Sequence, residues 1–317
     1  MSKQNILITG GGGPSTEALQ SLWANNYVMY FADADINRII PNVPNEMKIE
    51  IPWANAKNFI TEMKKIIIEK KIDVLISQVD EELLTLAEIE REGSTCSFII
   101  PDREFIDGFL DKYAASSSIK NKLNADPNTR LLESTAQIES KNLIIKPRKG
   151  RGSRDLFFSK NESELEGLKK YLSSKYDSFI TQDFVDGEEY SVQVINNLNG
   201  RIKAIVPIKI YEKRGSTTHG VVENNPIVIK FCEEFQAAFS TKGTYNIQLI
   251  VERKSQKIFV FEVNPRVSTT MCVAVYAGID PIKLYFETNG ANKIVLAPNG
   301  VEIRRYWKNV FSKNHGE

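Results

Sequence analysis

The stretch Phe259-Val-Phe-Glu-Val-Asn-Pro-Arg-Val-Ser268 places polar side chains inside an apolar run. Glu262 and Asn264 are two residues apart, so on a β-strand they point to the same face. Ile258 and Val260 would share that face, where a carboxylate is costly unless a cation meets it. Two oxygen ligands followed by an arginine fit a magnesium ion that carries nucleotide phosphates. The alternative is a strand end at which polar side chains reach water.

A second strand precedes this one and is expected to form a hairpin with it. Residues 244–252 are rich in β-branched and aromatic side chains, the polar residues 253–256 predict a turn, and residues 257–263 return. One register, with a loop of about five residues, sets Gln248 opposite Glu262 and adds a third oxygen ligand. A slip of one residue would turn Gln248 to the other face, so the register stays open at this point.

Composition and charge exclude several classes of protein. The chain has 317 residues, enough for two or three domains, and its 42% hydrophobic and 26% charged residues are ordinary for a globular protein. A formal net charge of +1 offers no field for nucleic acid or a membrane surface. No apolar run reaches the roughly 20 residues that span a bilayer, and the N-terminus does not resemble a signal peptide. We therefore expect a cytoplasmic protein without nucleic-acid or membrane partners.

Cysteine and histidine chemistry is not indicated. Cys96, Cys232 and Cys272 are isolated from one another, with neither a metal-ligand spacing nor a disulfide framework. Each is expected to be a small apolar filler in a reducing compartment. There are two histidines, and His315 lies in a polar tail. Histidine metal sites and serine–histidine triads are therefore not expected.

The order of predicted elements indicates two parts. Strands are expected at 5–9, 27–32, 73–77 and 97–100, alternating with helices at 16–25, 56–70 and 81–92. This alternation predicts a parallel sheet with helices on both faces. A helix near 103–122 leads into an α+β part with a mainly antiparallel sheet. Besides the hairpin, its expected strands are 143–147, 156–158, 178–184, 189–195 and 202–211, with helices at 162–171 and 227–238.

Further segments could meet a nucleotide. Lys149-Gly-Arg-Gly-Ser-Arg154 is a glycine-rich basic turn that could close N–H groups and cations over phosphates, or could be a hairpin tip with solvated charges. Lys146 follows an apolar run and either reaches solvent or meets an anion. In the next hairpin, the backbone of Phe184 and Val185 could pair with an adenine edge and Glu189 with ribose hydroxyls. A plain hairpin is the alternative.

These segments follow one another in a fixed order: lysine, basic glycine loop, hinge with an acidic end, glutamine, then Glu-x-Asn-x-Arg. The order resembles the ATP-grasp superfamily, most closely the ATP-binding half of the carbamoyl phosphate synthetase large subunit. Residues 262–268 are similar to that family's metal and phosphate strand almost letter for letter. The resemblance covers essentially the whole chain. It implies a Rossmann-like α/β domain at 1–108 and an ATP-grasp domain at 109–317, with a lid subdomain at about 123–185 and an antiparallel C-terminal part.

The resemblance also implies roles for individual residues. It implies phosphate-binding cations at Lys112 and Lys146, a lid loop containing Gly150, Gly152 and Ser153, an adenine hinge at Gln182, Phe184 and Val185, and a ribose ligand at Glu189. It implies metal ligands at Gln248, Glu262 and Asn264, and catalytic cations at Lys146 and Arg266, the latter steadying the transferring phosphoryl group. The family often has Glu where Gln182 stands, and the lid is more basic than usual, so nucleotide preference is left open.

The implied reaction uses ATP with Mg²⁺, or Mn²⁺ in its place. A small carboxylate would attack the γ-phosphate, and an amine or similar nucleophile would then displace phosphate from the acyl phosphate. Positioning and charge neutralisation suffice for such chemistry, which suits a site without an obvious nucleophile. The chain has one ATP-binding half and no glutaminase, so we expect a stand-alone carboxylate–amine ligase. Acceptor candidates are Arg214 and His219, in an expected polar loop, and Ser268. The substrates stay open, as does a homodimer.

Two other functions remain to be weighed. The N-terminal strand, glycine turn and helix, with Asp33 ending the second strand, are similar to the fingerprint of an NAD-type Rossmann oxidoreductase. Counting from Gly10 or Gly11, however, the third glycine position holds Ser15 or Thr16. Such an enzyme also leaves the Glu-x-Asn-x-Arg strand unexplained. The other function is a nucleotide-binding sensor or scaffold without catalysis, against which the complete metal strand argues.

Overall fold

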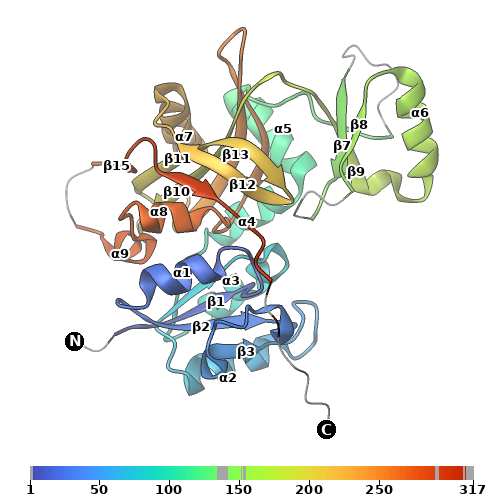
Figure 1. Ribbon diagram of the computed structural model, residues 1–317. Helices are drawn as coiled ribbons and strands as arrows, with labels where there is room; N and C mark the ends of the chain where they lie inside the picture. The colour runs from blue at the N-terminus through green and yellow to red at the C-terminus, as the bar shows by residue number, and fades with distance from the viewer. Residues whose placement is uncertain are drawn as a thin grey trace.

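The computed structural model describes residues 3–133, 142–150, 152, 155–289, 293–309 and 311, and within them the chain forms three sheets (Figure 1). A five-stranded sheet occupies the lower half of this view and a seven-stranded sheet the upper half. A four-stranded sheet stands to one side. None of the helices in these ranges is long and apolar enough to cross a membrane.

The N-terminal sheet is parallel and has the strand order β3-β2-β1-β4-β5. Its strands are β1 (Asn5–Thr9), β2 (Val28–Asp33), β3 (Lys48–Glu50), β4 (Val74–Ser77) and β5 (Ser97–Phe98). Helices α1 (Thr16–Trp23), α2 (Phe59–Glu69) and α3 (Leu83–Arg91) cover both faces, which confirms the predicted α/β architecture. The strand order reverses between β1 and β4, so the loops after these strands open a crevice at the carboxyl edge.

The seven-stranded sheet has the order β14-β13-β10-β11-β12-β16, with β15 beside β11, and is antiparallel except for that last pair. Its strands are β10 (Gly187–Asn196), β11 (Ile202–Arg214), β12 (Ser216–Val222), β13 (Thr244–Glu252), β14 (Ile258–Asn264), β15 (Val295–Leu296) and β16 (Glu302–Arg304). The helices of this part are α4 (Arg103–Leu110), α5 (Lys112–Leu123), α7 (Pro226–Ala238), α8 (Met271–Tyr276) and α9 (Pro281–Phe286).

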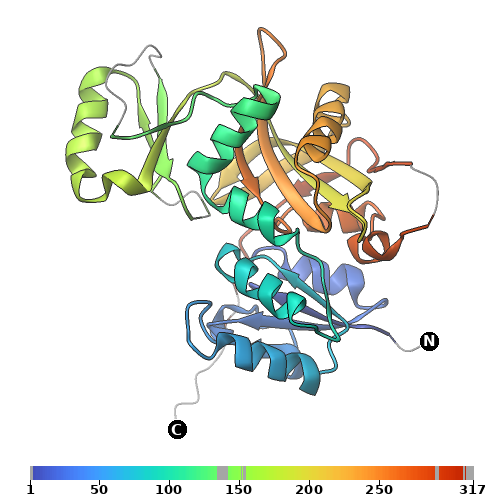
Figure 2. The same cartoon turned by 180° about the vertical axis from the view of Figure 1, so that it is seen from behind.

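The four-stranded sheet, with the order β6-β9-β7-β8, stands apart from the other two (Figure 2). Its strands are β6 (Arg130–Leu131), β7 (Leu143–Pro147), β8 (Phe157–Ser159) and β9 (Phe179–Asp183), and α6 (Glu162–Tyr171) packs on it. The described residues also form the short 3-10 helices η1 (Ile36–Arg38), η2 (Asn45–Met47), η3 (Asp80–Glu82) and η4 (Ser173–Ser178). The sheet has an apolar cluster of its own, from Leu132 to Phe179.

The predicted helix at 103–122 is two helices, and the polar loop expected around Arg214 is a hairpin. Asp111 adopts an extended conformation between α4 and α5, and its carboxylate accepts hydrogen bonds from the N–H groups of Tyr113 and Ala114. It therefore starts a new helix rather than continuing the old one. At the hairpin, β11 runs to Arg214 and β12 returns after Gly215, whose φ of +72° suits a tight turn. Polar residues dominate this hairpin because it projects beyond the core.

A bulge in β14 corrects the predicted facing of its side chains. Gln248 pairs with Glu262, as predicted, but Leu249 pairs with Val260, so Phe261 is an extra residue in the ladder. Val260 and Val263 consequently lie in the same apolar cluster, together with Ile258. Glu262 and Asn264 both point to the opposite face of the sheet, away from this cluster. The prediction that Ile258 and Val260 share a face with Glu262 is therefore wrong. The extra residue in the bulge shifts the alternation of side chains along the strand by one position.

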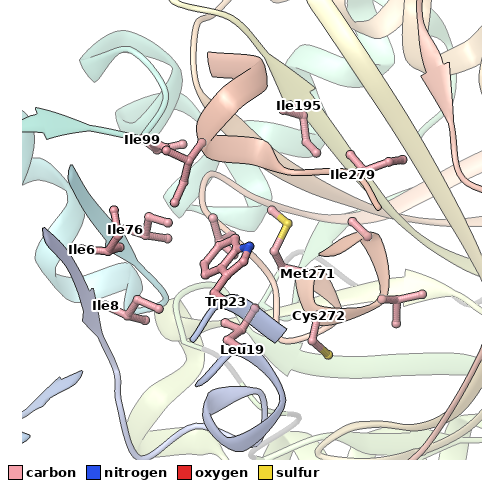
Figure 3. Packing of buried hydrophobic residues seen from close by; sticks show 14 of the residues in the cluster. Ile6, Ile8, Leu19, Trp23, Ile76, Ile99, Ile195, Met271, Cys272 and Ile279 are labelled. Atoms are coloured by element: carbon pink, nitrogen blue, oxygen red, sulfur yellow. The ribbon is translucent and has the colours of Figure 1, made fainter. Parts of the chain in front are cut away.

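The two larger sheets share one apolar core (Figure 3). Trp23 and Leu19 of α1 pack with Met271 of α8 and with Ile195 of β10, in a cluster that also contains Ile6. Trp23 is 2% exposed. This core includes residues from the N-terminal lobe, which contains the five-stranded sheet, and from the central lobe, which contains the seven-stranded sheet. Its burial therefore holds the N-terminal sheet against the central sheet. A second cluster, under the other face of the central sheet, packs against α4, α5 and α7.

Candidate active site

One face of the central sheet carries a continuous polar row. Successive cross-strand pairs place Ser191 beside Gln248 and Gln248 beside Glu262, and the next row joins Asn246 to Asn264. The alternate residues of the same strands, such as Ile247 and Leu249, lie in the apolar cluster on the opposite face. This alternation is typical of an antiparallel sheet with one face in the core. The polar face lines a cleft of about 1540 Å³ that extends to the N-terminal sheet.

Lys146 approaches this row from β7 of the four-stranded sheet. Its Nζ donates to the carbonyl oxygen of Phe261 at 2.8 Å and lies 5.3 Å from the centre of the Phe261 ring. Burial lowers the pKa of Lys146 to about 8, because desolvation, aided by the charges of Lys112 and Lys213, outweighs the attraction of Glu262 and Glu189. An anion bound beside this buried ammonium would offset its desolvation and the repulsion from its two cationic neighbours.

The two neighbouring lysines are already paired with the predicted ligands. Lys112, the first residue of α5, lies 3.6 Å from Glu262 and donates to the carbonyl oxygen of Gly150 at 2.7 Å. Lys213 forms an ion pair with Glu189 and donates to Gln248 Oε1 at 3.0 Å. Glu189, Gln248 and Glu262 therefore bind lysines in this structure. Lys213 was not predicted as a site residue.

Arg266 connects the polar row to the N-terminal domain. Its guanidinium pairs with both carboxylate oxygens of Asp80, in the turn η3 that follows β4. The same group donates to Asn264 Oδ1 at 3.3 Å and to the carbonyl oxygen of Val267 at 3.2 Å. Arg266 is 8% exposed, so this arrangement is largely shielded from solvent. Sequence reasoning missed Asp80, whose partner lies 186 residues away.

The predicted adenine hinge lies at the end of β9. Gln182 is 1% exposed, and its Nε2 donates to Thr129 Oγ1 at 3.0 Å. Its Oε1 has no hydrogen-bond partner among the described residues. Phe184 is half exposed, although its N–H donates to the carbonyl oxygen of Asn142, and Val185 lies in the short segment before β10. The structure thus brings Gln182 close to Lys146, because both donate toward the carbonyl oxygen of Phe261.

The described part of the lid loop meets the β11–β12 hairpin. A Cβ atom on Gly215 would lie 3.5 Å from the carbonyl oxygen of Gly152. Gly150 is held by Lys112, as described above. Residues 151, 153 and 154, including the predicted Ser153, lie outside the described residues.

The three predicted acceptor residues differ in placement. Ser268 lines the cleft, and its hydroxyl lies 3.1 Å from Gln193 Oε1 and 2.6 Å from Thr270 Oγ1. Arg214 also lines the cleft, at the hairpin tip, with its charge paired to Glu212. His219 is not among the lining residues, and its Nε2 lies 2.6 Å from Glu302 Oε1. The structure therefore brings Ser268 and Arg214 to the cleft and leaves His219 outside it.

The N–H groups of Gly11, Gly12 and Gly13 in the N-terminal glycine turn are already bonded within the chain. The N–H groups of Gly11 and Gly13 donate to carbonyl oxygens of the chain, at 2.8 and 2.9 Å. The N–H of Gly12 donates to Asp33 Oδ2 at 2.9 Å. In a dinucleotide site, the turn would offer N–H groups to the pyrophosphate and the acidic residue would bind ribose. The turn is instead part of the cleft wall.

The donor set of the polar row fits a hard divalent cation. Asn246 is fully buried, and its Oδ1 has no hydrogen-bond partner among the described residues. It adjoins the amide of Asn264 and the pair Gln248 and Glu262. Oxygen atoms of this kind are the ligands that magnesium prefers. The described residues contain no cluster of three His, Cys, Asp or Glu side chains, so any metal here would depend on amide oxygens as well as one carboxylate.

Comparison with known proteins gives the family. Among solved structures, L-amino acid ligase from Bacillus licheniformis is 14% identical, with a TM-score of 0.65 over 86% of this chain and 69% of that chain. N5-carboxyaminoimidazole synthetase from Staphylococcus aureus with ADP is 14% identical, with a TM-score of 0.69 over 92% and 80%. Biotin carboxylase from Campylobacter jejuni is 17% identical, with a TM-score of 0.67 over 90% and 70%.

These likenesses establish the fold. The search of curated proteins found no match. Residues 109–270, just over half of the chain, match the family model described as an ATP-grasp domain. The match spans Lys112, Lys146 and the whole metal strand. The resemblance read from the Glu-x-Asn-x-Arg motif is thereby confirmed: this chain belongs to the ATP-grasp family.

Proposed function

We propose that this chain is a magnesium-dependent ligase that activates a small carboxylate and joins it to an amine or similar nucleophile. Family membership makes it an ATP-binding protein and an ADP-forming, ATP-dependent ligase. The observation that carries the finer proposal is the convergence of Lys112, Lys146 and Lys213 on the row of Gln248 and Glu262. Cations and oxygen ligands in one cleft are what a metal-bound triphosphate requires.

Each charged group has a proposed part in binding ATP. Lys112 and Lys146 bind phosphate oxygens, and among the described residues Lys146 has no carboxylate in salt-bridge contact that it must leave. The oxygens of Gln248, Glu262 and Asn264 would hold Mg²⁺, or Mn²⁺, which supplies charge neutralisation when bound. Glu189 binds ribose. Lys213 must then release Glu189 and Gln248, and its ammonium becomes available to the phosphates.

The nucleotide base has a proposed site between the sheets. Gln182, Phe184 and Val185 form the adenine hinge, and the unpartnered Oε1 of Gln182 offers an acceptor there. Gly150, Gly152 and Ser153 belong to the loop that covers the phosphates. The proposed domains are 1–108 and 109–317, with the lid subdomain at about 123–185. A cytoplasmic location and a homodimer remain predictions.

The chemistry consists of two displacements. An oxygen of the substrate carboxylate attacks the γ-phosphorus, the bond to the β-phosphate oxygen breaks, and ADP leaves. The nitrogen of the amine then attacks the acyl carbon, phosphate leaves, and the nitrogen loses a proton. Arg266 and Lys146 stabilise the negative charge that the transferred group carries. Ser268 and Arg214 are proposed to contact the substrate carboxylate at the cleft wall.

Substituting Glu262 tests the proposal. We expect the wild-type chain to form ADP from ATP and Mg²⁺ with one particular carboxylate and amine from a panel, and Glu262→Gln to lose at least about 100-fold in this rate. Glu252→Gln, on the same hairpin but at its solvent end, is the matched control and should retain the rate. Phosphate release and ADP are both measured.

Three results would contradict the proposal. Full activity in Glu262→Gln would remove the metal assignment. Tight binding of magnesium–ATP without turnover for any pair in the panel would instead favour a nucleotide-binding protein without catalysis. Absence of nucleotide binding in the wild-type chain would overturn the site as a whole.

A further inference from the structure

The ion pair between Asp80 and Arg266 joins the N-terminal lobe to the segment that directly follows the predicted metal strand. Asp80 starts the turn η3, directly after β4, and its side chain is 15% exposed. Arg266 follows the last residue of β14 by two positions, and its side chain is 10% exposed. Both carboxylate oxygens accept from the guanidinium. Two oxygens meeting Nε and Nη2 fix the plane of the guanidinium as well as its position.

The contact continues from Arg266 to the metal strand. Nη2, which meets Asp80 Oδ2 at 3.4 Å, also donates to Asn264 Oδ1 at 3.3 Å. Asn264 is 5% exposed and pairs across the ladder with Asn246. The orientation of the Asn264 amide therefore depends on a guanidinium whose own orientation depends on Asp80. We propose that Asp80 is a positioning residue for the reaction: it orients Arg266 and, through it, the oxygen of Asn264. This inference rests on the proposed function.

Asp80 acts from outside the cleft. Its neighbours Val79 and Glu81 line the cleft, whereas Asp80 does not, because its side chain is turned toward Arg266. An arginine side chain has several rotatable bonds, and a largely buried one that loses its carboxylate becomes an uncompensated charge. It would reorient toward water or another carboxylate. Partners that orient metal ligands in this way typically contribute about 10- to 100-fold to metal affinity or activity.

The turn that carries Asp80 lies where the N-terminal domain would meet a ligand. The crevice between the loops after β1 and β4 is the place where open parallel sheets bind small molecules. The loop after β1 and the residues flanking Asp80 both line the cleft. Asp80 therefore ties the crevice of the N-terminal sheet to Arg266, the cation proposed to face the transferring group.

Other cross-lobe contacts provide a comparison. Lys242 pairs with Glu90 at 2.7 Å, and Tyr27 donates to Asp280 at 2.7 Å. Neither pair lines the cleft. If the Asp80 contact only held the lobes together, its removal would have the same effect as removal of Glu90. If Asp80 orients the site, the two substitutions differ in activity although both break one ion pair between the lobes.

The experiment compares Asp80→Asn, Asp80→Glu and Glu90→Gln with the wild-type chain. We expect Asp80→Asn to lower kcat about 10- to 100-fold at saturating ATP. It should also raise, by several fold, the Mn²⁺ concentration that half-saturates the protein–ADP mixture, measured by electron paramagnetic resonance. Glu90→Gln should keep both values. Asp80→Glu retains the charge and both oxygens, so it should recover part of kcat although it is longer than the native side chain.

The outcomes separate this inference from the proposed function. Equal losses in Asp80→Asn and Glu90→Gln, or wild-type Mn²⁺ binding and kcat in Asp80→Asn, would overturn the positioning role while the ligase proposal stands. A wild-type chain that neither forms ADP nor binds Mn²⁺ with ADP would overturn both. Circular dichroism of each variant establishes that the comparison is between folded proteins, and Asp80→Glu supplies the test if Asp80→Asn does not fold.

Discussion

The charge of Lys146 depends on its surroundings. Burial lowers its pKa to about 8, so near that pH the nucleotide-free protein holds it as a mixture of ammonium and amine. Phosphate oxygens placed beside it would favour the ammonium and raise the pKa again. Binding of ATP is then coupled to proton uptake. Above about pH 8, Lys146 is mostly neutral in the nucleotide-free protein and must gain a proton when ATP binds. Below about pH 8, Lys146 already carries that proton.

ATP affinity should therefore be constant below about pH 8 and fall above it, by at most about tenfold per pH unit for one proton. Lys146→Met should bind ATP more weakly at neutral pH and should lose this pH dependence. Isothermal titration calorimetry in buffers of different ionisation enthalpy measures both affinity and proton uptake. A wild-type affinity that stays constant to pH 10 would show that Lys146 does not meet the phosphates.

Sequence reasoning selected the candidate site residues that stand in a local pattern and missed the candidates that do not. The pairing of Gln248 with Glu262 could be predicted because the two strands and the turn between them are contiguous in the sequence. Lys213 was not predicted as a site residue because the segment around it was expected to be a polar loop between strands and not a hairpin. Asn246 stands two residues before Gln248, and the same period would have included it. Asp80 gave no local signal, since its role depends on a partner that only the tertiary fold brings near.

The break between α4 and α5 places Lys112 at the site. Asp111 caps α5, and its carboxylate also pairs with Arg148 at 2.6 Å, next to the lid loop. Because Asp111 is extended, Lys112 starts a separate helix, and its Nζ lies 3.6 Å from Glu262 Oε1. The bulge at Phe261 has a similar effect on β14, because without it Glu262 and Val263 would exchange faces. Neither interruption follows from average propensity, because each is set by a single residue's contacts.

Asp111→Ala should destabilise the protein by about 1–2 kcal/mol through loss of the helix cap. It should also weaken ATP binding, because Lys112 is the first residue of the helix that Asp111 begins. Urea denaturation and calorimetry measure the two effects. Asp107→Ala, at an exposed position on α4, is the control and should change neither. Unchanged ATP affinity in a destabilised Asp111→Ala variant would mean that the contribution of Lys112 to ATP binding does not depend on the helix cap at Asp111.

At the level of the whole molecule, the shared core makes the N-terminal and central sheets a single unit. The predicted succession of an α/β part and an α+β part is confirmed, because hydrophobic periodicity reports it locally. Sequence could not show that α1 and α8 bury their apolar faces against each other. That contact, drawn in Figure 3, joins two segments that are distant in the sequence. Ala18 of α1 and Cys272 of α8 also line the cleft.

Trp23→Ala should therefore destabilise both lobes together, by about 3–5 kcal/mol. Trp53→Ala is the matched control, since that indole is 63% exposed and its loss should cost little. Urea denaturation followed by circular dichroism and by tyrosine fluorescence should give one coincident transition for each variant. Two separated transitions in Trp23→Ala would show that the lobes fold independently.

The four-stranded sheet differs from the rest of the molecule in how it is attached. It has its own apolar cluster, and the described contacts that join it to the site are polar, from Lys146, Gln182 and Arg148. Among these contacts, the Arg148–Asp111 ion pair weakens as dissolved salt screens it, whereas burial of apolar surface does not weaken in this way. We therefore expect ionic strength to change the kinetics of this enzyme more than its stability. ADP should leave faster in concentrated potassium chloride, as stopped-flow displacement would show, while the folded body of the protein remains intact.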